Sequence, residues 1–71
     1  MNLYIKELIQ DYKGDSYEHF SQYIYKTFQR EIDASKGTQK NKYIKIRNDI
    51  LKYIAANRSG VTLELRKNNY Q

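Results

Sequence analysis

The chain has no cysteine and a single histidine among its 71 residues. No disulfide can therefore form, and His19 has no thiol partner with which to complete a structural zinc site. A chain of this length buries only about 60% of the surface that its unfolded form exposes, so its fold is marginally stable. We expect one small domain over residues 1–71, without metal or cofactor, and self-association as the remaining support.

Proline is also absent, and no segment is of low complexity, which argues against long disordered regions. Long apolar runs are missing as well, since Lys6, Glu7 and Asp11 interrupt the first stretch. The sequence therefore predicts neither a signal peptide nor a membrane-spanning helix. These absences favour a cytoplasmic protein.

Glycine occurs only at Gly14, Gly37 and Gly60, and the intervals are of helical length. Glycine commonly ends helices, and the apolar residues between these positions recur every three or four residues, as on a helix with one buried face. Asp15 with Glu18, or Ser16, would cap the second helix, and Thr38 the third. The predicted helices span about residues 3–13, 16–34 and 38–57. Their predicted core residues are Tyr4, Ile5, Leu8, Ile9 and Tyr12, then Tyr17, Phe20, Ile24, Phe28 and Ile32, then Tyr43, Ile46, Ile50, Tyr53 and Ile54.

The pattern changes after Gly60. Val61, Leu63 and Leu65 alternate with polar residues, which is the period of a half-buried strand. A lone strand needs a partner for its backbone groups, either residues 2–5 or the same strand of a second subunit across a twofold axis, and we favour the second. The predicted fold is thus mainly α, with three helices followed by one C-terminal strand at 61–66, in a homodimer.

Acidic residues are scarce in the second half of the chain. Residues 1–33 carry four basic and six acidic side chains, whereas residues 34–71 carry nine basic and two acidic ones. A cluster of positive charge is what binding to a phosphate backbone requires, because each neutralised phosphate releases counterions. The asymmetry therefore favours a nucleic-acid partner.

The third predicted helix gathers part of this charge on one face. Asn41, Lys45, Asn48 and Lys52 would lie within one sector, opposite the apolar residues. Lysine reaches guanine or phosphate oxygens and asparagine pairs with the edge of adenine, so this face suits double-stranded DNA. Arg66 would add further charge. The candidate nucleic-acid-binding residues are Lys36, Lys40, Asn41, Lys42, Lys45, Arg47, Asn48, Lys52 and Arg58.

The sequence shows no catalytic constellation. His19 stands beside Phe20 with no nucleophile or acid–base pair around it, and there is no glycine-rich phosphate loop. We expect His19 at the surface and no enzymatic activity. The leading hypothesis is a small regulator of transcription that binds DNA, of the kind common in phages and plasmids.

Two other functions stay open. Tyrosine and arginine are enriched at protein interfaces, and Ile44 lies off the predicted core face, which favours a small inhibitor or adaptor that docks on an acidic protein surface. Anionic membranes also attract basic chains, but binding to them needs a helix whose apolar face is free. Here those faces are expected to share one core, so the expected partner is nucleic acid or an acidic protein surface and not a membrane.

Overall fold

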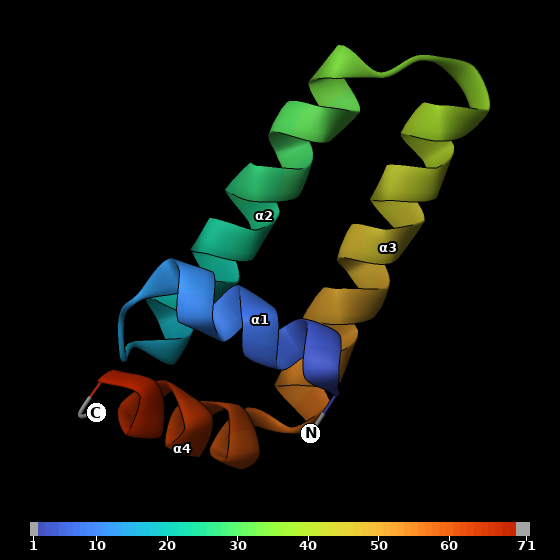
Figure 1. Cartoon of the computed structure of the whole chain (residues 1–71). Helices are drawn as coiled ribbons and strands as arrows, with labels where there is room; N and C mark the ends of the chain where they lie inside the picture. Colours follow the sequence, from blue (N-terminus) through green and yellow to red (C-terminus); the bar gives the residue numbers. More distant parts are fainter. Residues whose placement is uncertain (1, 70–71) are drawn as a thin grey trace.

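The computed structural model of the chain describes residues 2–69. The helices within them are α1 (Leu3–Tyr12), α2 (Tyr17–Ala34), α3 (Gly37–Ala56) and α4 (Arg58–Asn69). The second and third form a long antiparallel hairpin, and α1 and α4 lie across its lower end (Figure 1). The molecule measures 41 × 20 × 20 Å along its principal axes. It is therefore an elongated hairpin with a broader base.

Side-chain caps begin the first two helices. Asn2 Oδ1 accepts the backbone N–H of Tyr4 at 2.7 Å, and Ser16 Oγ accepts a backbone N–H from the first turn of α2 at 3.3 Å. Each bond satisfies one of the N–H groups that a helix start leaves without an intrahelical acceptor. Ser16 is thus the cap of α2, and the predicted capping box of Asp15 and Glu18 is not its N-cap.

The first helix ends at Tyr12, two residues before Gly14. Lys13 adopts the left-handed conformation with φ 60°, and its N–H bonds to the carbonyl of Ile9. Gly14 is needed for a different reason, because a Cβ at this position would lie 2.6 Å from Cε2 of the Tyr12 ring. The glycine therefore permits a close approach and does not supply the turn.

The link between the hairpin helices consists of Ser35 and Lys36. Gly37 opens α3 with φ 62°, a conformation that glycine adopts without steric cost. Lys36 is the N-cap of this helix and makes no side-chain cap bond, so the prediction of Thr38 as the cap is wrong. A two-residue link obliges α2 and α3 to lie side by side along their length.

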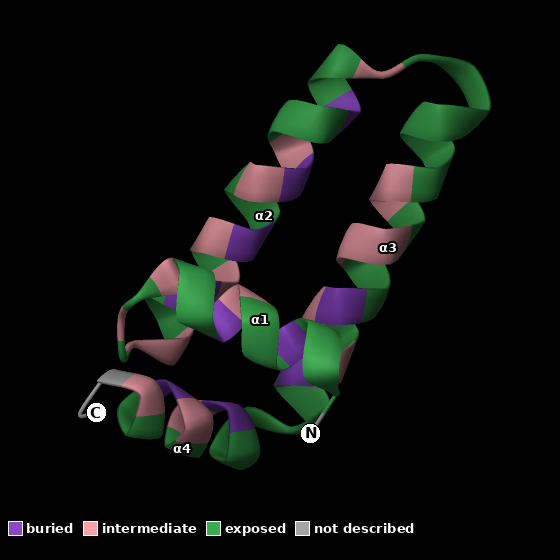
Figure 2. Cartoon of the chain, in the orientation of Figure 1, coloured by how far each residue is buried: buried purple, intermediate pink, exposed green. Residues whose placement is uncertain are grey.

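One apolar core joins all four helices (Figure 2). The core faces predicted for α2 and for the C-terminal half of α3 are confirmed, whereas Tyr4 of α1 is 48% exposed. Tyrosines and other apolar residues at the edge of the core are half-buried, which lets each tyrosine ring pack while its hydroxyl stays in water. The buried apolar side chains are Ile5, Ile9, Phe20, Ile24, Phe28, Ile32, Ile50, Ile54, Val61 and Leu65.

The predicted C-terminal strand is wrong, because residues 61–66 lie inside α4. Val61 and Leu65 are both 0% exposed and stand four residues apart, on one face of a helix, whereas Leu63 is 59% exposed. Any three apolar residues that alternate with polar ones include two that stand four residues apart, so the pattern at 61–65 fits a helix as well as a strand. Burial of that pair against the other helices offsets the poor helix propensity of Gly60.

Because residues 61–66 are helical, the predicted fold class is wrong and the predicted strand pairing of the dimer is lost. Residues 2–69 form four helices and contain no strand, so three helices followed by a strand is not the fold of this chain. Gly60 does not end a helix but lies in the first turn of α4. The ribbon expected across a twofold axis has no strand from which to form.

Candidate nucleic-acid interface

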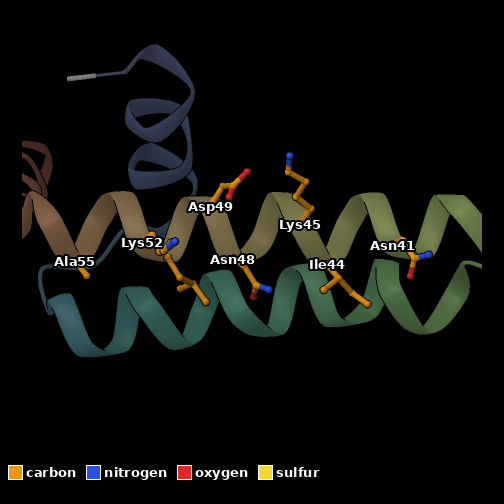
Figure 3. Close-up of a pocket in the computed structure, with 8 residues that line it drawn as sticks. Asn41, Ile44, Lys45, Asn48, Asp49, Lys52 and Ala55 are labelled. Atoms are coloured by element: carbon orange, nitrogen blue, oxygen red, sulfur yellow. The ribbon is translucent and has the colours of Figure 1, made fainter.

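An exposed side of α3 carries the predicted ridge. Asn41, Lys45, Asn48 and Lys52 are all exposed, and their spacing of three and four residues places them on successive turns of one side. They line a shallow groove together with Ile44, Asp49, Leu51 and Ala55 (Figure 3). The structure thus brings together four of the candidate residues, as the sequence predicted.

The groove has an apolar and a charged side. In Figure 3, Ile44, Asn48 and Ala55 point toward α2, whereas Lys45 and Asp49 point away from it. Five of the eight lining residues are lysine, asparagine or aspartate, and the other three are Ile44, Leu51 and Ala55. The face therefore offers both charge and apolar contact to a partner.

Three further candidates lie at the distal end of the hairpin, where α2 gives way to α3. Lys36, Lys40 and Lys42 are exposed there. Ion pairs within residues 2–69 link Arg58 with Glu18 and Lys67 with Glu64, so none of the described carboxylates forms an ion pair with Lys36 or with a lysine of α3. With five basic side chains and one acidic one, Asp49, α3 creates a positive field that attracts anions.

Arg47 is placed differently from the prediction. Its side chain is half-buried, Nη1 donates to Oε1 of Gln29 at 2.8 Å, and the guanidinium lies 4.5 Å from the centre of the Tyr25 ring. Its Nε is buried without a hydrogen-bond partner among the described residues. A guanidinium over a tyrosine face gains cation–π attraction, so Arg47 attaches α3 to α2.

Arg58 also has a partner within the chain. It pairs with Glu18, and its guanidinium lies 4.5 Å from the centre of the Tyr17 ring. A backbone hydrogen bond lowers the pKa of Glu18 below its ordinary value, and the positive charge of Arg58 adds to that effect. Arg58 thus connects α4 to α2, and Glu18 offsets its charge.

A second basic surface lies on α4. Arg58, Thr62 and Arg66 recur every four residues and line a shallow groove with Ser59 and Leu63. The strand prediction obscured this surface, because a period of two places neighbours on opposite faces. Arg58, Thr62 and Arg66 stand four residues apart, and this helical spacing is the signal in the sequence that could have revealed the surface.

The described part of the chain shows no group of three or more His, Cys, Asp or Glu side chains that could hold a metal ion. His19 is exposed on α2, as predicted. None of the helices in residues 2–69 is long and apolar enough to cross a membrane. Comparison with protein-family models, curated proteins and solved structures finds no match to this chain.

Proposed function

We propose that this chain is a cytoplasmic, non-enzymatic regulator that binds double-stranded DNA through α3 and the link before it. The observation that carries the proposal is a set of exposed lysines without a described carboxylate partner, on one helix and its N-cap. Basic side chains of this kind bind phosphates, whatever the base sequence. The set consists of Lys36, Lys40, Lys42, Lys45 and Lys52.

The dimensions of α3 suit a duplex. Its 20 residues extend over roughly 30 Å, and the major groove, about 12 Å wide, admits a helix. Asn41 and Asn48 lie two turns apart, or roughly 10 Å, which is about the rise of three base pairs. The asparagines would contact base edges while Lys45 and Lys52, which lie on one flank of them, contact phosphates.

The distal end of the hairpin is also the accessible end. Neither α1 nor α4 extends over it, so a duplex can approach the N-terminal half of α3 from the side that faces away from α2 (Figure 1). Recognition helices of the helix-turn-helix class contact bases with their N-terminal residues, and the corresponding half of α3 holds Asn41 but not Asn48. This likeness concerns only the accessible half of the helix.

The proposal is tested by binding to a random-sequence duplex over a series of salt concentrations, followed by fluorescence anisotropy. The logarithm of the binding constant should fall with the logarithm of salt concentration by about 0.9 for each phosphate contacted. A triple variant, Lys40→Gln with Lys42→Gln and Lys45→Gln, should lose most of the affinity and flatten the slope by roughly 2.7. Arg47 is left intact, because it packs between helices.

The matched control removes the same charge elsewhere. Lys6→Gln, Lys26→Gln and Arg30→Gln change exposed residues of α1 and α2 and should leave most of the affinity in place. Equal losses in the two triple variants would mean that net charge alone attracts DNA. That result, or no binding at low salt, would reject α3 as the interface.

Dimerisation remains a separate part of the proposal. Two copies of α3 about 34 Å apart would read the two halves of a symmetric DNA site. Sedimentation velocity over a range of protein concentrations, with and without duplex, measures the oligomeric state. A monomer under all of these conditions would remove the dimer but leave the α3 interface as proposed.

A further inference from the structure

The groove along α3 has a feature that phosphate binding does not require. Asn41, Ile44, Asn48, Leu51 and Ala55 follow one another at intervals of three and four residues along it. This is the heptad spacing with which one helix packs along another. Ile44 and Leu51 pack against the core and also line the groove, so both keep apolar surface available to a second helix.

The neighbouring helix adds an aromatic edge. Arg47 lies three residues after Ile44 and four before Leu51, so it shares their side of α3. It in turn covers the ring of Tyr25, which is 48% exposed on α2. Tyrosine and arginine beside an apolar strip are typical of the residues that dominate binding energy at protein interfaces.

The charges beside the strip decide between possible helices. Lys45 and Lys52 follow Ile44 and Leu51, at positions that flank a helix–helix contact, whereas Asp49, which also lines the groove, follows Asn48 at a position farther from that contact. A second copy of α3 would bring these lysines toward each other and set polar Asn48 against an apolar residue or another asparagine. A helix with acidic flanks would pair with both lysines instead.

We propose that an acidic amphipathic helix of a partner protein docks in the α3 groove and thereby excludes DNA. Its apolar residues contact Ile44 and Leu51, and its carboxylates pair with Lys45 and Lys52. The exclusion rests on the proposed function, because both partners require the same two lysines. Docking itself depends only on the groove, so the two ideas can fail separately.

The probe is a synthetic three-heptad peptide with leucine at both core positions and glutamate at both flanking positions. Its matched control carries lysine at the flanking positions. In fluorescence anisotropy with the full chain, the glutamate peptide should bind and the lysine peptide should not. Added unlabelled, the glutamate peptide should also displace a labelled duplex.

Variants separate the two partners. Leu51→Ala should weaken peptide binding about tenfold, and Asn48→Leu should strengthen it about fivefold, because a polar core position lowers the stability of a helix pair. Leu51→Ala alters neither the charge nor a proposed DNA contact, so binding of this variant to random DNA should stay within about twofold. The double variant Lys36→Gln with Lys40→Gln should weaken binding to DNA and leave peptide binding unchanged, since neither residue lines the groove.

Asn48→Leu protects the test against misfolding, because Asn48 is exposed and its replacement leaves the core intact. Failure of the glutamate peptide to bind at low salt would overturn the inference, as would equal binding of the two peptides or no gain from Asn48→Leu. Peptide binding without any DNA binding would support the docking surface and reject the proposed function.

Discussion

The two ends of the α2–α3 hairpin are built differently. Where α1 and α4 cross it, four helices meet, and Phe20, Ile24 and Ile54 are completely buried (Figure 2). At the distal end only two helices face each other, and Tyr43 and Ile44 of α3 remain half-exposed. The base therefore supplies most of the core, whereas the distal end is free to carry charge and partner contacts.

This division suits a small chain. Mutual repulsion among lysines destabilises a compact state, and the cost is smallest where the side chains stay in water and few elements are packed. The distal lysines stand at such a place. The comparison predicts that changes at the base affect folding and that changes at the distal end affect binding.

Removal of α4, by ending the chain at Asn57, should have the largest effect. Burial of Val61 and Leu65 contributes about 3 to 6 kcal/mol. The whole domain is expected to have a free energy of unfolding of roughly 4 to 11 kcal/mol. The truncated chain should lose cooperative thermal unfolding in circular dichroism, and a retained sharp transition would show that the base does not depend on α4.

Replacement of one buried isoleucine at each end is the next test. Ile54→Ala at the base should lower the free energy of unfolding by about 4 kcal/mol, within the range of about 2 to 5 for such changes. Ile32→Ala at the distal end should cost only about 2 kcal/mol, because a site with fewer packed neighbours relaxes more easily. Chemical denaturation measures both values, and equal losses would contradict the comparison.

The helical structure of residues 61–66 makes a smaller prediction. Gly60→Ala should raise the free energy of unfolding by about 0.5 to 1 kcal/mol, because alanine is the better residue inside a helix. Leu63→Ser should change it by no more than about 0.5 kcal/mol, since Leu63 is exposed. Destabilisation by both substitutions would favour the strand over the helix.

The smallest effect concerns alkaline pH. The Tyr12 ring lies 5.4 Å from the Phe20 ring and 5.3 Å from the Tyr23 ring, measured between centres. Burial raises the pKa of Tyr12, and the negative charge of Asp15 adds to the effect. The folded state thus favours the neutral phenol, so its stability is complete below the ordinary pKa of about 10 and falls as pH rises through the raised pKa.

Tyr12→Phe should therefore reduce the loss of stability between neutral and alkaline pH. Thermal melting over a series of pH values measures it, with Tyr4→Phe, at an exposed position of the same helix, as the matched control. An unchanged alkaline loss in Tyr12→Phe would show that this hydroxyl does not contribute.

Part of the candidate site was predictable from local geometry. Once residues 38–57 form a helix, the rotation of about 100° per residue places four of the candidate residues on one side of it, whichever residues pack against its other side. These four are Asn41, Lys45, Asn48 and Lys52. The outcome for Arg47 was not predictable in this way, because its ring partner is on another helix. An arginine in sequence looks the same whether it faces solvent or an aromatic ring.

Local sequence alone determined the first three helices, most of their core positions and the uneven charge of the two halves of the chain, since periodicity and composition act over a few residues. Only the tertiary structure decided that residues 61–66 are helical and that Arg47 and Arg58 are held by Tyr25 and Tyr17. In each of these cases the deciding contact comes from a residue far away in the chain. Such distant contacts decide whether a short apolar pattern becomes a helix or a strand, and whether an arginine faces solvent or another side chain.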